Sequence, residues 1–401
     1  MTTVHDLRTD ELGAAAPLLD RLPHARGALA FVRHGRGIAG WGEAHRLDVR
    51  GADAAARIQV WFDDLVRSAA AAGDAEPVVF VSLGFSPEDA SVAVVPRVAW
   101  RAGPDGVQQI LGDRGARSQP IPTRITRPGT IRWSDPEQSA LGYRAAVASA
   151  VQAIRAGELG KVVLSHDLTA VTESEVDERF LLSALADRYP SCWAYAVDQL
   201  VGASPEMLVE RHRENRRLVV TSRVLAGTGW AEHVGDPVIA DLLASAKNRS
   251  EHRYAVDSVA SALRGVSTRL DVPPEPRALV LANLVHLATD VVGELADPAP
   301  SALQLAAALH PTGAVGGHPR DAALELIRRL EGRPRGRYAA PVGWMDARGD
   351  GEFALALRGA VVDGHTVRLT AGGGLVADSD PDSEVREAQV KMIPMRDALE
   401  S

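Results

Sequence analysis

The amino-acid sequence predicts a mixed α+β protein. Short β-rich runs alternate with turn residues near the N-terminus, and longer helical patterns interleave with strand patterns through the rest of the chain. A regular strand–helix–strand rhythm is missing, which argues against a doubly wound parallel sheet. The length of 401 residues is by itself compatible with two or three domains.

The first part of the chain, residues 1–130, is predicted to be rich in β-strands. Its apolar, β-branched runs are ALAFV (28–32), VVFVSLGF (78–85) and SVAVVPRVAW (91–100). One helical pattern covers residues 52–72. Residues 104–130 are polar and rich in Pro and Gly, so we interpret them as a connector and as the candidate boundary within the chain.

The second part, residues 131–401, is predicted to mix helices with strands. A helix over residues 136–156 leads into a strand that begins at Lys161. The last helix begins at Asp380-Pro381, where an acceptor side chain caps the helix and Pro occupies its first turn. The other expected helices are 237–263, with Asp236 as its N-cap, and 319–330, and the other expected strands are 194–201, 207–211, 218–222, 339–345, 351–357, 359–362 and 367–371.

Composition excludes several classes of function. The net charge of −8 argues against a nucleic-acid partner, which usually requires a basic face. The single cysteine, Cys192, cannot form an internal disulfide and is typical of a reducing compartment. The N-terminus has acidic residues and no long apolar core, and no run of 18 apolar residues occurs, so we expect neither a signal peptide nor a membrane span. A cytoplasmic location is therefore expected.

Two groups of residues could carry chemistry. Glu384, Glu387 and Lys391 share one face of the last predicted helix, an arrangement that is typical of a solvated surface. The AGGG run at 371–374 follows a predicted strand and could offer backbone N–H groups to an anion. Because this run has neither the GK[ST] of a phosphate-binding loop nor a dinucleotide fingerprint, it is weak evidence for a nucleotide.

A larger set of segments occurs in order along residues 137–398. The segments are KVVLSHDL (161–168), GASPEMLVER (202–211), LAGT (225–228), SAKNRSEH (245–252), LVHLATDVVGEL (284–295), LHPTGAVGGHPRDAALELI (309–327), RYAAPVGWMDARGDGEFALALRGA (337–360) and LTAGGGLVADSDPDSEVREAQVKM (369–392). Together they resemble the chorismate-utilising enzymes, the anthranilate synthase component I-like family, and most closely its isochorismate synthase branch. GIAGWGEAHRL (37–47) and VVPRVAWR (94–101) resemble the looser N-terminal part of the same family.

The resemblance implies one large α+β domain with layered sheets around a buried site. Residues 1–130 would be the β-rich N-terminal part of this fold and residues 131–401 the chorismate-binding catalytic region. The implied reaction is the Mg²⁺-dependent isomerisation of chorismate to isochorismate, which adds water at C2 and expels the C4 hydroxyl. Because water is a poor nucleophile and hydroxide a poor leaving group, this reaction needs a base on one side of the ring and an acid on the other.

The resemblance assigns the base to Lys161 and the acid to Glu206. Lys161 must be partly neutral near pH 7 to activate water, which requires desolvation or cationic neighbours. Glu206 must stay protonated until it gives its proton to the departing hydroxyl, which a partly apolar, anion-rich pocket favours.

The same resemblance supplies metal-binding and substrate-binding positions. Glu251 and Glu387 match Mg²⁺ ligands, with Glu384 as a nearby or water-bridged acid, since carboxylates with substrate oxygen and water are typical surroundings of this ion. Arg358, helped by Tyr338, would hold the second carboxylate of chorismate. The remaining substrate-binding positions are Gly227, Thr228, His286, Ala314, Gly372 and Lys391; a purely structural histidine is the alternative for His286.

Sister reactions of the family are the alternatives. Aminating relatives lack the lysine at position 161, or have a lysine where this chain has Ala226, so by the same resemblance water is favoured over ammonia as the nucleophile and no glutaminase subunit is expected. The resemblance also implies a monomer. A salicylate synthase, which goes on to eliminate pyruvate, would share Lys161 and Glu206. The LHPT-x-A stretch that ends in Ala314 resembles isochorismate synthases more closely than that branch.

Four positions depart from the family pattern. Gly229-Trp230 follow LAGT where basic residues are usual, Asn248 stands at a usually acidic position, and Gly313 replaces a common proline. Loss of a carboxylate near the metal could weaken Mg²⁺ binding, and a glycine makes a substrate-lining loop more flexible. Because of these departures, a divergent protein that only binds chorismate remains an alternative to an enzyme.

Overall fold

The strands of the protein form one continuous antiparallel sheet. The computed structural model describes residues 16–112, 122–134, 136–229, 237–280 and 284–401. Within them, pairing runs in the order β14, β11, β10, β17, β16, β3, β4, β2, β1, β8, β9, β18, β19 and β7. The strands are β1 (Leu29–Arg33), β2 (Arg36–Val49), β3 (Val78–Ser82), β4 (Ser91–Gly103), β5 (Gly106–Leu111), β6 (Ile131–Trp133), β7 (Lys161–Thr172), β8 (Trp193–Val197), β9 (Leu200–Ser204), β10 (Met207–Glu214), β11 (Arg217–Gly229), β12 (Ser267–Asp271), β13 (Arg277–Val280), β14 (Val285–Leu295), β15 (Gly317–His318), β16 (Pro341–Asp346), β17 (Gly351–Leu355), β18 (Gly359–Asp363) and β19 (Thr366–Leu375).

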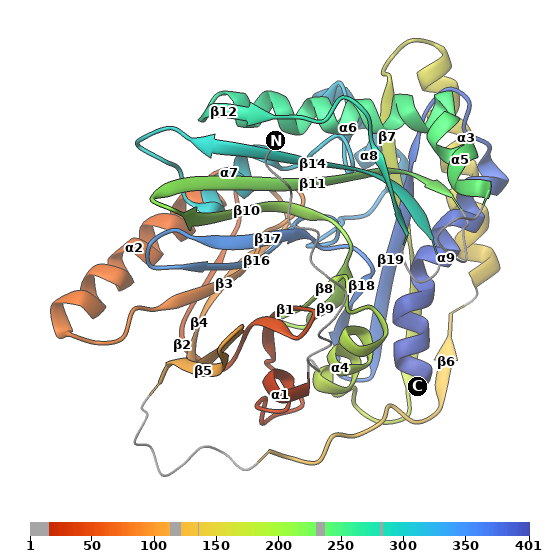
Figure 1. Cartoon of the computed structure of the whole chain (residues 1–401). Helices are drawn as coiled ribbons and strands as arrows, with labels where there is room; N and C mark the ends of the chain where they lie inside the picture. The colour runs from red at the N-terminus through yellow and green to blue at the C-terminus, as the bar shows by residue number, and fades with distance from the viewer. Residues whose placement is uncertain (1–15, 113–121, 135, 230–236, 281–283) are drawn as a thin grey trace.

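Helices cover the outer faces of this sheet (Figure 1). Helix α6 packs on β11, α3 packs on β7, α9 packs on β19, and α2 packs against α7. The helices are α1 (Ala16–Leu19), α2 (Ala54–Ala72), α3 (Pro136–Arg155), α4 (Glu178–Arg188), α5 (Pro237–Ala244), α6 (Ala246–Arg264), α7 (Ala302–Leu309), α8 (Arg320–Glu331) and α9 (Pro381–Glu400). Among the described residues, none of these helices is long and apolar enough to cross a membrane.

The sequence prediction of an α+β fold with layered antiparallel sheets is confirmed. Strands of the first 130 residues pair directly with strands of the remainder, because β1 lies beside β8 and β3 lies beside β16. Helices α2, α3, α6, α7 and α8 pack apolar side chains against the sheet in the largest buried cluster. Removing these side chains from water is the main driving force that holds the layers together.

The start of α9 follows the prediction. Asp380 lies before the helix, its carboxylate accepts a hydrogen bond from the N of Ser383 at 2.9 Å, and Pro381 occupies the first turn. This cap satisfies one N–H group that the helix itself leaves unpaired. The cap therefore fixes where α9 begins, and with it the helix face on which Glu384 and Glu387 lie.

Three predicted elements differ from the structure. The helix expected over residues 237–263 is broken at Ser245, whose hydroxyl caps α6 by accepting from the N of Asn248; the predicted cap Asp236 lies outside the described residues. The strand expected over 194–201 is the hairpin of β8 and β9, because Asp198 and Gln199 adopt the left-handed conformation of a two-residue turn. Within the predicted connector 104–130, β5 forms a hairpin with β4.

The two ends of the strand order meet at one place. In β19, Gly372, Gly373 and Gly374 pair with residues 165, 164 and 163 of β7. At the opposite end, β11 pairs with β14 through residues that include Thr228 and His286. A cavity lies between these two strand pairs.

Candidate active site

Most residues assigned from the family resemblance line one cavity. Strands β11 and β14 form one wall, β7 and β19 form another, and α6 and α9 each contribute one side chain. Lys161 and Glu387 are not among the lining residues and lie directly behind them. The predicted residues that line the cavity are Glu206, Gly227, Thr228, Glu251, His286, Ala314, Tyr338, Arg358, Gly372 and Lys391.

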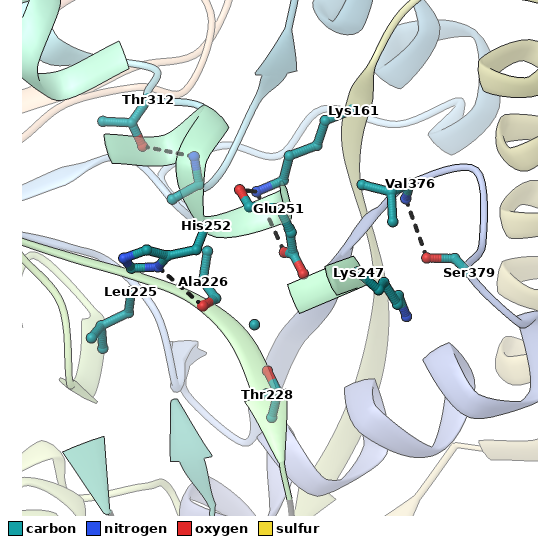
Figure 2. Close-up of polar contacts among 12 residues, drawn as sticks. Lys161, Leu225, Ala226, Thr228, Lys247, Glu251, His252, Thr312, Val376 and Ser379 are labelled. Carbon is teal, nitrogen blue, oxygen red and sulfur yellow. Dashed lines mark hydrogen bonds and ion pairs between the residues drawn. The ribbon is translucent and has the colours of Figure 1, made fainter. Parts of the chain in front are cut away.

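Lys161 is the first residue of β7, and its side chain is completely buried. Its Nζ lies 3.4 Å from Oε1 of Glu251 and donates to the backbone oxygen of Glu251, also at 3.4 Å (Figure 2). Because Glu251 itself lines the cavity, the amine stands one side chain away from the open space.

Glu206 lies between β9 and β10 and is almost fully buried. Burial raises the pKa of this carboxyl to about 8, although a hydrogen bond from the N of Leu225 to Oε1, 3.2 Å long, and the charges of Lys161 and Lys391 oppose the shift. Desolvation disfavours the charged form of a carboxyl group. Glu206 is therefore mostly protonated at neutral pH.

Arg358 and His286 form a buried hydrogen-bonded pair. Nη2 of Arg358 donates to Nε2 of His286 at 3.0 Å, and burial lowers the pKa of both groups, that of His286 to about 3. Since a guanidinium group only donates, Nε2 is the acceptor, and the other ring nitrogen can donate to the oxygen of Gly227 at 3.3 Å. Among the described residues, Arg358 has no carboxylate partner, so its remaining donors are available to an anion.

Glu387 of α9 connects the two ends of the sheet. Its Oε1 accepts hydrogen bonds from Nζ of Lys391 at 2.6 Å and from the hydroxyl of Thr228 at 2.9 Å. Burial opposes the ionisation of Glu387, but these contacts outweigh it and lower its pKa to about 2. Lys391 also donates to the oxygen of Gly372 at 3.0 Å, so α9 ties β11 to β19.

The face of α9 that carries Glu384 turns toward the protein interior. Glu384 is only 3% exposed, and its Oε1 lies 3.0 Å from Nζ of Lys247 on α6. Burial and the neighbouring carboxylate of Glu387 raise the pKa of Glu384. The interpretation of this helix face as a solvated surface is wrong.

Three carboxylates gather over the glycines of β19. A Cβ atom at Gly374 would stand 2.1 Å from Oε1 of Glu251, and one at Gly373 would stand 3.1 Å from Oε2 of Glu384 and 3.6 Å from Oε1 of Glu387. A side chain at position 374 would therefore displace Glu251. Glycine is needed here because the carboxylates approach the backbone closely.

This donor set fits Mg²⁺, which prefers carboxylate and water oxygens. Glu251 and Glu387 would hold the ion, with Glu384 beside them. Across the described residues, no three His, Cys, Asp or Glu side chains form a group that could hold a metal ion by themselves, and Lys161, Lys247 and Lys391 lie beside Glu251, Glu384 and Glu387 respectively.

The departures from the family pattern have local explanations. The amide of Asn248 donates to the hydroxyl of Ser245 at 3.0 Å, and its side chain lies against Gly227. A Cβ atom at Gly313 would stand 2.9 Å from the oxygen of Tyr254, so glycine lets this loop pack on α6. Trp230 lies outside the described residues.

Several cavity residues were not identified from the sequence. Strand alternation could have indicated Val163, which faces the same side of β7 as Lys161. The others lie within the quoted family segments, but most are apolar, and the resemblance assigned them no role. The missed lining residues include Val163, Pro205, Leu225, Val315, Leu357 and Thr370.

A buried acid, a buried amine and a free guanidinium around one cavity define an enzyme site for a small anionic substrate. The family described as "Chorismate binding enzyme" matches residues 111–400. The chain therefore belongs to the chorismate-binding enzyme family.

Named relatives cover nearly the whole chain. Isochorismate synthase DhbC of Bacillus subtilis (strain 168) is 34% identical over 352 residues, which are 84% of this chain and 84% of that protein. The crystal structure that carries the name of a 2,3-dihydroxybenzoate-specific isochorismate synthase, DhbC from Bacillus anthracis, superposes with a TM-score of 0.80 at 31% identity, covering 96% of this chain and 99% of that one. For MenF, the menaquinone-specific isochorismate synthase from Escherichia coli, the TM-score is 0.74 at 25% identity, with 97% and 92% covered.

Proposed function

We propose that this protein is an isochorismate synthase, an isomerase that converts chorismate to isochorismate with Mg²⁺. The observation that carries the proposal is the pairing of a protonated carboxyl, Glu206, with a buried amine, Lys161, at one cavity. Moving a hydroxyl from C4 to C2 requires a proton donor and a proton acceptor at separate points of the ring. Identity of 34% to an isochorismate synthase across most of the chain supports the same reaction.

Lys161 takes the proton of the water that attacks C2. Its Nζ is held by Glu251, so the amine acts when the Glu251 carboxylate turns to another partner. Glu206 gives its proton to the C4 hydroxyl as that group leaves, which converts hydroxide into water as leaving group. A pKa of about 8 suits this role, because the acid is loaded at neutral pH and still releases its proton.

The two carboxylates of chorismate need separate counter-charges. Arg358, oriented by His286, holds one of them, with the hydroxyl of Tyr338 beside it, and burial raises the pKa of that hydroxyl to about 12, so it remains a donor. Glu251 and Glu387 would hold Mg²⁺, which would supply positive charge for the other. Lys391 and the backbone of Gly372 complete the substrate contacts.

Water rather than ammonia is the nucleophile in this proposal. Ala226 lines the cavity, and its oxygen accepts a hydrogen bond from Nδ1 of His252 at 3.2 Å (Figure 2). Nε2 of His252 accepts from the hydroxyl of Thr289 at 2.7 Å. Position 226 therefore offers no side chain for covalent chemistry. We further propose that the enzyme acts in the cytoplasm, consistent with the buried free thiol of Cys192. We also propose that it acts as a monomer without a glutaminase subunit.

A product assay tests the proposal. Purified protein is incubated with chorismate and Mg²⁺, and the products are separated by chromatography. We expect isochorismate as the main product, and at least about a hundredfold loss of its formation in Lys161→Ala. Salicylate with pyruvate as main products would instead support the salicylate synthase alternative, and binding of chorismate without turnover would support a non-catalytic protein.

A further inference from the structure

The outer edge of β7 has an incomplete strand partner. Strand β19 pairs with one edge of β7 along ten residues, whereas on the other edge β15 pairs only with Lys161 and Val162 and β6 only with residues 170–172. The N of Val163 still donates to the oxygen of Gly316 at 2.8 Å. Between β15 and β6, the oxygen of Val163 and the N of Ser165 have no strand beside them in the described part of the chain, and buried backbone groups need partners.

One ion pair of side chains replaces the missing strand. Nη2 of Arg335 donates to the oxygen of Val163 at 2.7 Å, and Oε1 of Glu331 accepts from the N of Ser165 at 2.8 Å. Arg335 and Glu331 bind each other through Nη2 and Oε1 at 2.6 Å, and both side chains are 1% exposed. The pair therefore continues the edge of β7 immediately after Lys161.

Arg335 also reaches two other walls of the cavity. Its Nη1 donates to the oxygen of Val315 at 2.9 Å, and Val315 and its neighbour Ala314 line the cavity. Its own backbone oxygen accepts from the N of Tyr338 at 3.2 Å. The guanidinium lies 4.3 Å from the centroid of the Phe85 ring, which covers it on one side. One residue thus contacts the segments that carry Lys161, Ala314 and Tyr338.

We propose that Arg335, oriented by Glu331, is a positioning residue that sets the distance between the strand carrying Lys161 and the loop that forms the ring-side wall. The inference rests on the proposed function, because it concerns the alignment of that reaction. A planar fork with fixed donor directions can hold two carbonyl groups at a defined separation, which a lysine ammonium cannot. Misplacement of a base by about 1 Å can cost about a hundredfold in rate.

A second buried ion pair provides a matched control. Asp177 and Arg179 are 0% and 3% exposed, and Arg179 donates to the oxygens of Leu22 and Thr123. Like Arg335, Arg179 joins segments that are distant in sequence. None of its contacts lines the cavity, so its loss affects stability alone.

The experiment compares Arg335→Lys with Arg179→Lys in the full chain. Melting temperature, kcat and KM for chorismate are measured, together with amide hydrogen exchange of residues 161–165 and 312–316. We expect both variants to lose thermal stability. Only Arg335→Lys should lower kcat, by about 10- to 100-fold with KM changed less than about threefold, and only it should speed exchange in both segments.

Equal kcat values in the two lysine variants, or unchanged exchange in both segments, would overturn the inference. If Arg335→Lys does not fold, Glu331→Gln takes its place, since it keeps the acceptor for Ser165 and removes the charge that orients Arg335; the same kcat and exchange criteria apply. If the unchanged protein forms no isochorismate, the proposed function fails, and the exchange comparison then decides the positioning role separately.

Discussion

Two interiors of the same sheet are filled in opposite ways. The aromatic core, defined by Phe31, Phe80, Trp193, Tyr195 and Trp344, is closed by large apolar side chains. The cavity is lined by several glycine and alanine residues, by a few larger side chains such as Leu225, Tyr338 and Leu357, and by charged side chains. Both regions lie on strands of the same antiparallel sheet, so strand pairing alone does not distinguish the aromatic core from the cavity. Side-chain volume decides where the sheet leaves space for a substrate.

Each interior also contains a glutamate with a raised pKa, partly buried in the first case and almost fully buried in the second. Beside the aromatic core, burial and the neighbouring Glu210 raise the pKa of Glu352 to about 7, and Nε1 of Trp193 donates to it at 3.3 Å. In the cavity, burial raises the pKa of Glu206 to about 8. A raised pKa therefore does not identify a catalytic acid. Of these two glutamates, Glu206 lines the cavity together with Arg358 and Lys391, whereas Glu352 does not line it.

The largest expected effect separates these two glutamates. Glu206→Gln should lower kcat by about a thousandfold, because the amide cannot protonate the leaving hydroxyl. Glu352→Gln should keep kcat within about threefold, since it removes a charge from a region without substrate. Steady-state assays of isochorismate formation measure both, and similar losses in the two variants would contradict the distinction.

The pH dependence of the same acid has a defined sign. Below a pKa of about 8, Glu206 holds the proton that it must donate, and above it the carboxyl is ionised. Activity should therefore fall as pH rises through about 8. A pH profile of kcat that continues to rise between pH 7 and 9.5 would assign the acid to another group.

Truncation of the aromatic core should affect stability instead of chemistry. Phe80 is completely buried, so Phe80→Ala leaves a cavity and should lower the free energy of unfolding by about 3 to 5 kcal/mol. Its kcat at a temperature well below the transition should match the unchanged protein. Chemical denaturation gives the first value, and a large change in kcat would show that the two interiors are coupled.

Metal binding should depend on the cavity carboxylates and not on surface acids. Glu251→Gln should weaken Mg²⁺ binding by at least about tenfold, because affinity follows the number of charged ligands. Glu325→Gln, which changes an exposed residue paired with Arg328, should have no effect. Isothermal titration calorimetry with Mg²⁺ checks both variants; equal affinities would refute the assignment of Glu251.

The smallest expected effect concerns the departure at position 248. Asn248→Asp adds a carboxylate one turn before Glu251, but the side chain points at Ser245 and Gly227. Mg²⁺ affinity should rise by no more than about threefold, since interactions between partly solvated charges are screened. The same calorimetric titration measures the Mg²⁺ affinity, with Asn248→Ala as the control. A tenfold gain in Asn248→Asp would place position 248 within reach of the metal.

Local patterns predicted local structure well. The cap of Asp380 on α9 and the helical spacing of Glu384, Glu387 and Lys391 were readable because they involve residues within a few positions of each other. The direction in which that helix face points was not readable, since it depends on α6, whose Lys247 pairs with Glu384 across 137 positions. Arg335 carried no signal of its role for the same reason: its pair with Glu331 is local, but the cavity segments that it contacts are reached through backbone oxygens distant in the sequence.

The sequence by itself determined the family, the α+β class and the set of residues with suitable chemistry, because motifs and short-range periodicity are properties of the order of residues. Only the tertiary structure decided that Glu206 is mostly protonated at neutral pH, that Lys161 stands behind Glu251, and that Arg358 lines the cavity with no carboxylate partner in the described ranges. Desolvation and ion pairing depend on which distant segments surround a group, and folding alone brings those segments together.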